Sequence, residues 1–138
     1  MALPSSQEAR IFYQAARQRF EDAEFLLKGD RTTGAVYLAG YAVECMLKAM
    51  VLSRTREKDH GKVVASFRGG KAHDFGWLIN EYIVRKGPPV PLPISRLFSL
   101  VNAWTTSIRY KPGAMKKRDA VVFVRAAEDI LSWGDGRL

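Results

Sequence analysis

The side chains most often used for catalysis are sparse in this sequence. Two histidines and one cysteine lie far apart and do not form a zinc-binding signature. Gly29 and Gly34 have the spacing of a P-loop, but Ala35 and Val36 stand where that loop needs lysine and serine or threonine. The chain also lacks the G-x-S-x-G turn of acyl-transfer enzymes. The sequence therefore predicts no metal site and no bound cofactor.

Positive charge is the strongest chemical signal. The chain has 22 basic against 14 acidic residues, a net charge of +8, and none of the excess lies in residues 1–30. Two stretches dominate, Arg54–Lys71 and Arg109–Arg118. Such a surface favours polyanionic partners because neutralised phosphates release counterions; the alternative is a solvated surface that only keeps the protein soluble. The candidate binding residues in the second stretch are Tyr110, Lys111, Lys116, Lys117 and Arg118.

Length and composition indicate one globular domain, spanning residues 1–138. We expect no membrane-spanning segment, because no apolar stretch approaches about 20 residues. We expect no secretory signal either, because the N-terminus lacks a basic segment followed by an apolar run. Cys45 has no second cysteine to pair with and lies in an apolar helical pattern, so it is interpreted as a buried thiol in a reducing cytoplasm.

The elements that must position these groups are helical. The first helix is expected over residues 5–28, with Ser5 and Glu8 as a capping box. The second, over residues 33–53, is apolar almost all the way round and therefore belongs in the middle of a bundle. Its charged exceptions stand four residues apart, oriented for a favourable pair; they are Glu44 and Lys48.

The second half of the chain predicts shorter helices. Residues 54–72 are charged, contain glycines and lack periodicity, so they are interpreted as a loop. Asp74 is expected to cap a third helix that ends at Val84, before a proline-rich break. Ser95 is expected to cap a fourth helix. A fifth is expected to start between Lys116 and Asp119 and to run to Trp133. The predicted fold is all-α, a four- to five-helix up-and-down antiparallel bundle.

Three segments of the chain resemble one known family. The string from Asp22 to Val51, DAEFLLKGDRTTGAVYLAGYAVECMLKAMV, is similar to the first two helices of a HEPN domain. The string KAHDFGWLI resembles the Lys-x-His-Asp-Leu start of the family's third helix. The pair Arg109-Tyr110, followed by a basic linker and a helix that ends in ILSW, resembles its close. Together these segments extend the resemblance over roughly residues 8–133.

The resemblance implies a helical bundle that dimerises. Many family members are ribonucleases, often bacterial toxins paired with a nucleotidyltransferase-like antitoxin, and others are noncatalytic and bind nucleotide, RNA or a partner. Catalytic members carry an Arg-x(4–6)-His motif near the last helices. Arg109 matches the arginine, but Ala114, Met115 and Lys116 occupy the window for the histidine. The apolar residues expected to serve the dimer are Phe25, Val122 and Phe123.

Two residues are candidates for catalysis. Metal-independent RNA cleavage needs a general base or acid and a cation that stabilises the charge on the phosphorane. His73 is the candidate for the first role and Arg109 for the second, with Glu44 or Asp74 orienting the imidazole. In the structural alternative, His73 and Asp74 only cap the third helix. The remaining charges, Glu44, Lys48 and Arg109, would then form a buried ionic network.

Two other pairs have the Arg-to-His spacing of the family motif. Arg54 precedes His60, and Arg68 precedes His73, but both pairs belong to the expected middle loop, and such spacings arise easily by chance. The sequence thus predicts a cytoplasmic HEPN-domain protein that binds nucleotide or RNA, either as a ribonuclease-type toxin or without activity. The alternative is a noncatalytic module that dimerises and docks a partner protein.

Overall fold

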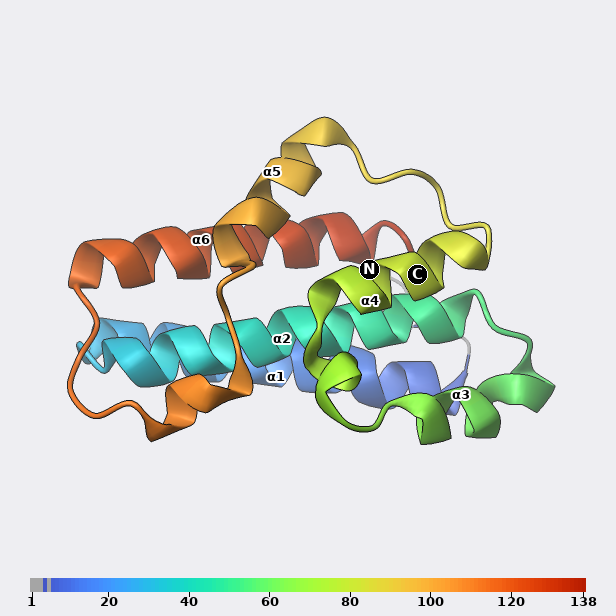
Figure 1. Ribbon diagram of the computed structural model, residues 1–138, viewed down its shortest axis with the longest axis horizontal. Coiled ribbons are helices and arrows are strands. Elements are labelled where there is room, and N and C mark those ends of the chain that lie inside the picture. Colours follow the sequence, from blue (N-terminus) through green and yellow to red (C-terminus); the bar gives the residue numbers. More distant parts are fainter. Residues whose placement is uncertain (1–3, 5) are drawn as a thin grey trace.

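The computed structural model describes Pro4 and residues 6–138 (Figure 1). Within these residues all of the regular secondary structure is helical, which confirms the predicted all-α class. There are six α-helices in this part of the chain rather than the predicted four or five: α1 (Gln7–Lys28), α2 (Thr32–Ser53), α3 (His60–Ser66), α4 (Phe75–Val84), α5 (Leu92–Val101) and α6 (Lys117–Asp135). The connecting 3₁₀-helices are η1 (Glu57–Asp59), η2 (Gly70–His73) and η3 (Thr106–Tyr110).

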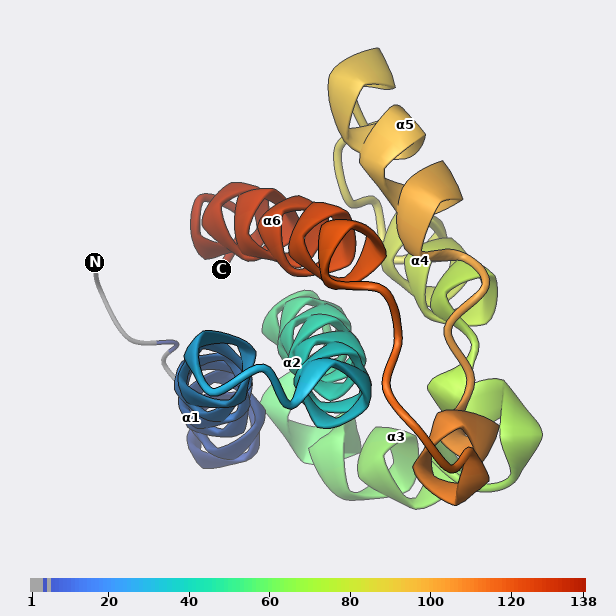
Figure 2. The same ribbon diagram turned by 90° about the vertical axis from the view of Figure 1, so that its left-hand side faces the viewer.

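The three long helices form the body of the molecule. α1 and α2 run antiparallel, and α6 runs beside α2 in the same direction as α2 (Figure 1). Seen from the end, α1, α2 and α6 form a triangle, with α4 and α5 on the side away from α1 (Figure 2). α4 packs on α2, and α5 packs on α6. α2 is therefore enclosed by its neighbours, as its all-round apolar pattern predicts.

The ends of α1 are set by local chemistry. Ser6 caps the N-terminus, because its hydroxyl accepts a hydrogen bond of 3.1 Å from the amide of Ala9. The predicted capping residue, Ser5, lies outside the described residues. At the other end, the backbone N–H of Gly29 donates to the carbonyls of Phe25 and Leu26, and the chain turns directly into α2.

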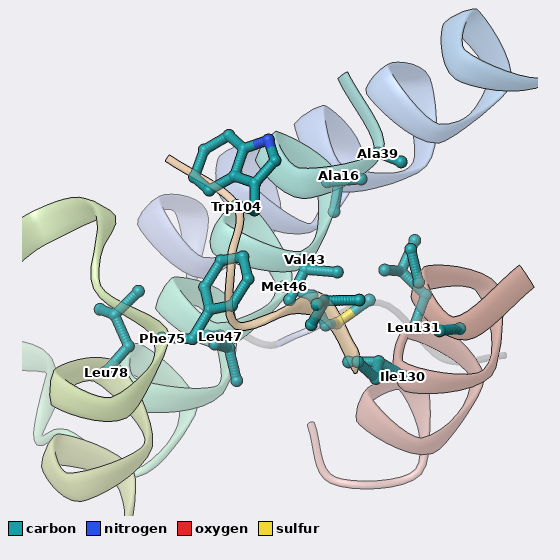
Figure 3. Close-up of a cluster of buried hydrophobic side chains, with 14 of the residues drawn as sticks. Ala16, Ala39, Val43, Met46, Leu47, Phe75, Leu78, Trp104, Ile130 and Leu131 are labelled. Carbon is teal, nitrogen blue, oxygen red and sulfur yellow. The ribbon is translucent and has the colours of Figure 1, made fainter. Parts of the chain in front are cut away.

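α2 is the core helix. By length and composition alone it is apolar enough to cross a membrane, contrary to the expectation from the sequence, but 78% of its most apolar window is buried inside the bundle. Burial against α1, α4 and α6 accounts for that composition. Figure 3 shows Met46 of α2 beside Ile130 and Leu131 of α6. Cys45, predicted to be buried, is only partly so.

The interpretation of residues 54–72 as a loop was wrong, because this segment contains η1, α3 and most of η2. α3 buries Val63 in the core, and it is also held to the body by His60, which is 3% exposed. One ring nitrogen of His60 lies 3.3 Å from the carboxylate of Glu8 and the other 2.8 Å from the carbonyl of Thr55. Tertiary hydrogen bonds therefore stabilise a helix that periodicity does not reveal.

The boundaries of the later helices agree with the prediction in two of three cases. Asp74 caps α4, since its carboxylate accepts from the amide of Trp77 at 3.1 Å. α6 begins at Lys117. α5, however, begins at Leu92, and the predicted cap Ser95 lies inside it. Proline is tolerated in the first turn of a helix, where the amide has no intrahelical partner, so the proline-rich segment extends further into helix than expected.

Trp104 fixes the segment that precedes the basic linker. Its indole N–H donates to the carbonyl of Tyr37 on α2 at 3.2 Å, and its ring stacks on Phe75 at 5.5 Å between centroids (Figure 3). The backbone of Gly40 makes room for this ring, because any side chain there would collide with the indole. Trp104 thereby anchors η3 beside η2 on one face of α2.

Candidate functional site

Four polar or aromatic residues form a stripe along α2. Tyr37, Tyr41, Glu44 and Lys48 follow one another at steps of four, three and four, the spacing that places residues on one helix face. We call this set the α2 stripe. The ring of Tyr41 contacts those of Tyr37 and Trp104 edge-on. The stripe therefore faces the segments that Trp104 anchors.

Glu44 and Lys48 form a buried ion pair, as their spacing predicts. Glu44 is 3% exposed and Lys48 is 7% exposed, and the ammonium lies 2.7 Å from the carboxylate. The same ammonium lies over the rings of Phe12 and Phe67, at 5.7 and 5.3 Å. Each charge compensates the other, which buried charges require.

The second carboxylate oxygen of Glu44 binds His73. His73 Nδ1 lies 2.8 Å from Glu44 Oε1. Because the carboxylate only accepts, Nδ1 carries the proton, and in the neutral ring Nε2 is left as an acceptor. Within the part of the chain that the structure describes, no group hydrogen-bonds to Nε2. Glu44 therefore orients the imidazole, one of the two arrangements that the sequence left open.

His73 opens onto a pocket. Its side chain is 38% exposed and lines a hollow of about 340 Å³ between η2 and the start of η3. Asp74, Trp104 and Thr105 are also in the wall of this hollow, which we call the His73 pocket. Asp74 uses its carboxylate to cap α4 rather than to hold the imidazole. The pocket thus presents one imidazole backed by one buried carboxylate.

Arg109 approaches the α2 stripe from η3, at Tyr37. Hydrogen bonding to the hydroxyls of Tyr37 and Tyr110 raises the pKa of its guanidinium. Burial raises the pKa of Tyr41 to about 12, helped by a hydrogen bond to Tyr37 and by the charge of Glu44, while Arg109 opposes the shift. The ring of Tyr41 meets that of His73 edge-on at 6.1 Å. Tyr41 therefore interacts with both candidate catalytic residues.

Arg109 does not belong to a buried ionic network. Its side chain is exposed, and its guanidinium lies 4.8 Å from the centroid of the exposed Tyr110 ring. The predicted network is limited to Glu44 and Lys48. Arg109 is thus available to an anion in solvent, and Tyr110 presents an open aromatic face beside it.

The basic linker, residues 111–118, is fully exposed and is tied to the turn between α1 and α2. The hydroxyl of Thr32 donates to the carbonyl of Met115 at 2.7 Å, and Lys117 Nζ donates to the carbonyl of Leu27 and to Asp30, both at 2.5 Å. Of the four predicted binding cations here, only Lys117 has an ion pair among the described residues; the others are Lys111, Lys116 and Arg118.

Arg54 and His60 do not form a site, because each is engaged elsewhere, and in the second pair His73 is held by Glu44. His60 is enclosed with Glu8 and the carbonyl of Thr55. Arg54 donates to the carbonyls of Arg85 and Lys86 beyond the end of α4. Among the described residues, no cluster of three or more His, Cys, Asp or Glu side chains is placed to hold a metal ion.

Comparison with known proteins gives one result. The family model described as the HEPN domain matches residues 9–137, nearly the whole chain. The chain belongs to the HEPN domain family. Neither the curated proteins nor the solved structures yield a match.

The candidate histidine of this HEPN chain, His73, comes from a different place than the histidine of the Arg-x(4–6)-His motif. The window after Arg109 lies in the exposed linker and holds no histidine. His73 instead comes from η2, and the α2 stripe joins it to Arg109. Sequence reasoning missed Tyr37 and Tyr41; Trp104 was a candidate either to stack a base or to belong to the core, and the structure buries it at 4% exposure. The signal for the tyrosines was their helical spacing from Glu44 and Lys48.

Proposed function

We propose that this HEPN protein binds single-stranded RNA, with backbone phosphates placed between the His73 pocket, Arg109 and the basic linker. One observation carries the proposal: a half-exposed histidine, held by a buried glutamate, lines a pocket that it shares with the start of η3, the segment that carries the exposed Arg109. The charge of Glu44 is compensated by Lys48, so it does not repel a phosphate near His73. Exposed cations on the linker continue the positive surface, which suits a polyanion rather than a single small anion.

Metal-independent cleavage of that RNA is a second candidate, favoured by the state of His73 Nε2. With Nδ1 donating to Glu44, Nε2 accepts the proton of a ribose 2′-hydroxyl. The freed oxygen attacks the adjacent phosphorus, the bond from phosphorus to the 5′-oxygen breaks, and the leaving oxygen takes a proton from water. Arg109 stabilises the added negative charge on the phosphoryl oxygens. The products would be a 2′,3′-cyclic phosphate and a 5′-hydroxyl.

The test of binding is fluorescence anisotropy with a labelled RNA oligonucleotide at several salt concentrations. Lys116→Ala/Arg118→Ala should weaken binding and reduce the salt slope by about 0.7 per lost phosphate contact. The matched control is Lys58→Ala/Lys62→Ala, which removes two exposed cations from η1 and α3. Binding that ignores salt, or equal effects of both double variants, would contradict the proposal. Gel analysis of the same mixtures in excess chelator tests cleavage, which Arg109→Ala should abolish.

The assembly of the protein is also a proposal. Phe25 on α1 and Val122 on α6 are 78% and 49% exposed, and an ion pair between Glu24 and Arg125 joins the two helices near them. We propose that this face forms a homodimer. Phe123, also predicted to serve it, is buried in the monomer. Light scattering of Phe25→Ser should give half the wild-type mass, and a wild-type monomer would contradict the dimer.

The cellular setting is also a proposal. We propose that the protein acts in the bacterial cytoplasm as the toxin-like half of a two-gene module, with a nucleotidyltransferase-like antitoxin as its partner. Membership of the HEPN family supports this setting. Expression of the chain with and without its neighbouring gene, followed by growth measurement, tests it. Growth that is equal in both cases would count against a toxin.

A further inference from the structure

A second pocket lies under the basic linker. It lies between α2, η3, the linker and α6, and has a volume of about 350 Å³. This volume is within the range of small-ligand sites. Its floor is apolar and at most 9% exposed, and consists of Val36, Trp104, Ile108 and Phe123. We call it the linker pocket. Neither the mechanism of cleavage nor the phosphate contacts use it.

The roof of this pocket is held in place. Thr33 on α2 donates through its hydroxyl to the carbonyl of Gly113 at 3.0 Å and accepts from the amide of Met115 at 3.2 Å. Thr32 binds the carbonyl of Met115. Figure 1 shows the linker passing from η3 to the start of α6 beside the first turns of α2. The hollow is thus bounded by fixed backbone.

The linker pocket adjoins the His73 pocket. Both are lined by Trp104 and Thr105, so these two residues form a shared wall. The faces of Trp104 are covered by Phe75 and Tyr37, which keeps the indole fixed as a partition. On one side of the partition lies an imidazole, and on the other an apolar hollow with the exposed Lys111 on its rim.

We propose that the linker pocket receives a nucleobase of the RNA whose phosphate lies at the His73 pocket. A nucleotide joins an apolar ring to an anion over a short distance, which is the combination that the two pockets offer. The basic rim favours a ligand that carries phosphate over a plain apolar one. Burial of a base against apolar side chains adds affinity through the hydrophobic effect, which depends little on which base is bound. This inference rests on the proposed function and adds a base site to it.

The experiment compares ligands with and without the base. Binding of AMP, UMP and ribose 5-phosphate is measured by competition against labelled RNA. AMP and UMP should each bind at least about fivefold more tightly than ribose 5-phosphate. Ala114→Trp fills the pocket from its exposed rim and should remove this advantage while leaving ribose 5-phosphate unchanged. Ala103→Phe, from the other side of the rim, is a second variant, and Ala65→Trp on exposed α3 is the matched control.

The outcomes separate the two proposals. If nucleotides and ribose 5-phosphate compete equally well, or if Ala114→Trp and Ala103→Phe act like Ala65→Trp, the base site is wrong and RNA binding stands. If neither RNA nor any of the three ligands binds, the proposed function fails and the base site fails with it. If the pocket variants instead change only the oligomeric mass, the hollow receives a second copy of the chain, and the base site is again overturned.

Discussion

The two histidines of this chain each pair with a glutamate. In one pair the histidine is buried and the glutamate is exposed, and in the other the glutamate is buried and the histidine is exposed. His60 is 3% exposed, and its partner Glu8 has a side chain that is 43% exposed. His73 has a side chain that is 38% exposed, and its partner Glu44 is 3% exposed. In the first pair both ring nitrogens have protein partners; in the second, one nitrogen is open to a pocket. The buried member of each pair stabilises the fold, and an exposed imidazole on a buried carboxylate is free for chemistry.

The largest effect is expected from the two glutamates. Glu44→Ala leaves the buried Lys48 without its carboxylate and should lower the free energy of unfolding by about 3–5 kcal/mol. Glu8→Ala removes a solvent-exposed partner and should lower the free energy of unfolding far less. Urea unfolding followed by circular dichroism measures both. The double variant Glu44→Leu/Lys48→Met, which removes both charges, should recover much of the loss; similar costs for the two alanine variants would break the comparison.

The histidines themselves should separate stability from function. His60→Ala deletes a buried ring with two hydrogen bonds and should cost about 2 kcal/mol of stability without altering RNA affinity per folded molecule. His73→Ala should cost about 1 kcal/mol or less and abolish any cleavage. The added control is His73→Gln, whose amide can still donate to Glu44 and should restore stability but not cleavage. If His60→Ala is fully folded but has lost RNA affinity, His60 would belong to the functional site and the assignment of the two histidines would be wrong.

Much of the fold could be predicted because it depends on local pattern. The all-round apolar character of α2 identifies the core helix, and Asp74 marks the start of α4. α3 could not be predicted, since it is only seven residues long and its buried His60 lies against a glutamate 52 residues away. The start of α5 was missed because proline was taken only as a breaker, although it fits the first turn of a helix.

The candidate site was also predictable only in part, because it depends on contacts between residues that are far apart in the sequence. The pair of Glu44 and Lys48 follows from helical spacing, but the bond between Glu44 and His73 joins residues 29 apart in the chain. That bond depends on where Trp104 places η2 and η3, and the space for Trp104 depends on Gly40. Sequence therefore identifies Glu44, His73 and Arg109 as candidates, while their positions relative to one another come from tertiary packing.

Lys116 and Lys117 of the linker differ in the same way as the two histidines: Lys117 has protein partners, and Lys116 has no ion pair among the described residues. Lys117 is bound to Asp30 and to the carbonyl of Leu27, so Lys117→Ala should leave the salt slope of RNA binding unchanged. Lys116→Ala should reduce it by about 0.7. Anisotropy titrations at 50–300 mM salt, a range of about sixfold, distinguish the two. Equal slopes for both variants would show that the ion pair opens to bind RNA.

The hydrogen bond between Lys117 and Asp30 should make the effect of Lys117→Ala on stability depend on pH. Hydrogen bonding to Lys117 lowers the pKa of Asp30, so the stabilisation is complete above the unfolded pKa of the carboxyl, about 3.9. It is lost as the pH falls through the lower folded value. The wild type should melt at a higher temperature than Lys117→Ala at pH 7, and the two melting curves should converge at about pH 2. A difference that persists in acid would assign the stabilisation to the bond with Leu27.

The smallest effect concerns Cys45, which follows Glu44 on α2. Burial, and then the charge of Glu44, raises the pKa of the Cys45 thiol to about 11. At pH 8 only about one molecule in a thousand is therefore a thiolate, the form that reacts with iodoacetamide. Alkylation of the folded protein should accelerate about tenfold per pH unit from pH 8 to pH 10. Labelling through local unfolding would instead level off near the unfolded thiol pKa of about 8.5.

Glu44→Gln removes the charge but keeps most of the burial, so at pH 9 it should speed labelling of Cys45 only a few-fold. A rate that does not change in Glu44→Gln would mean that the carboxylate of Glu44 is fully neutralised by Lys48 and His73.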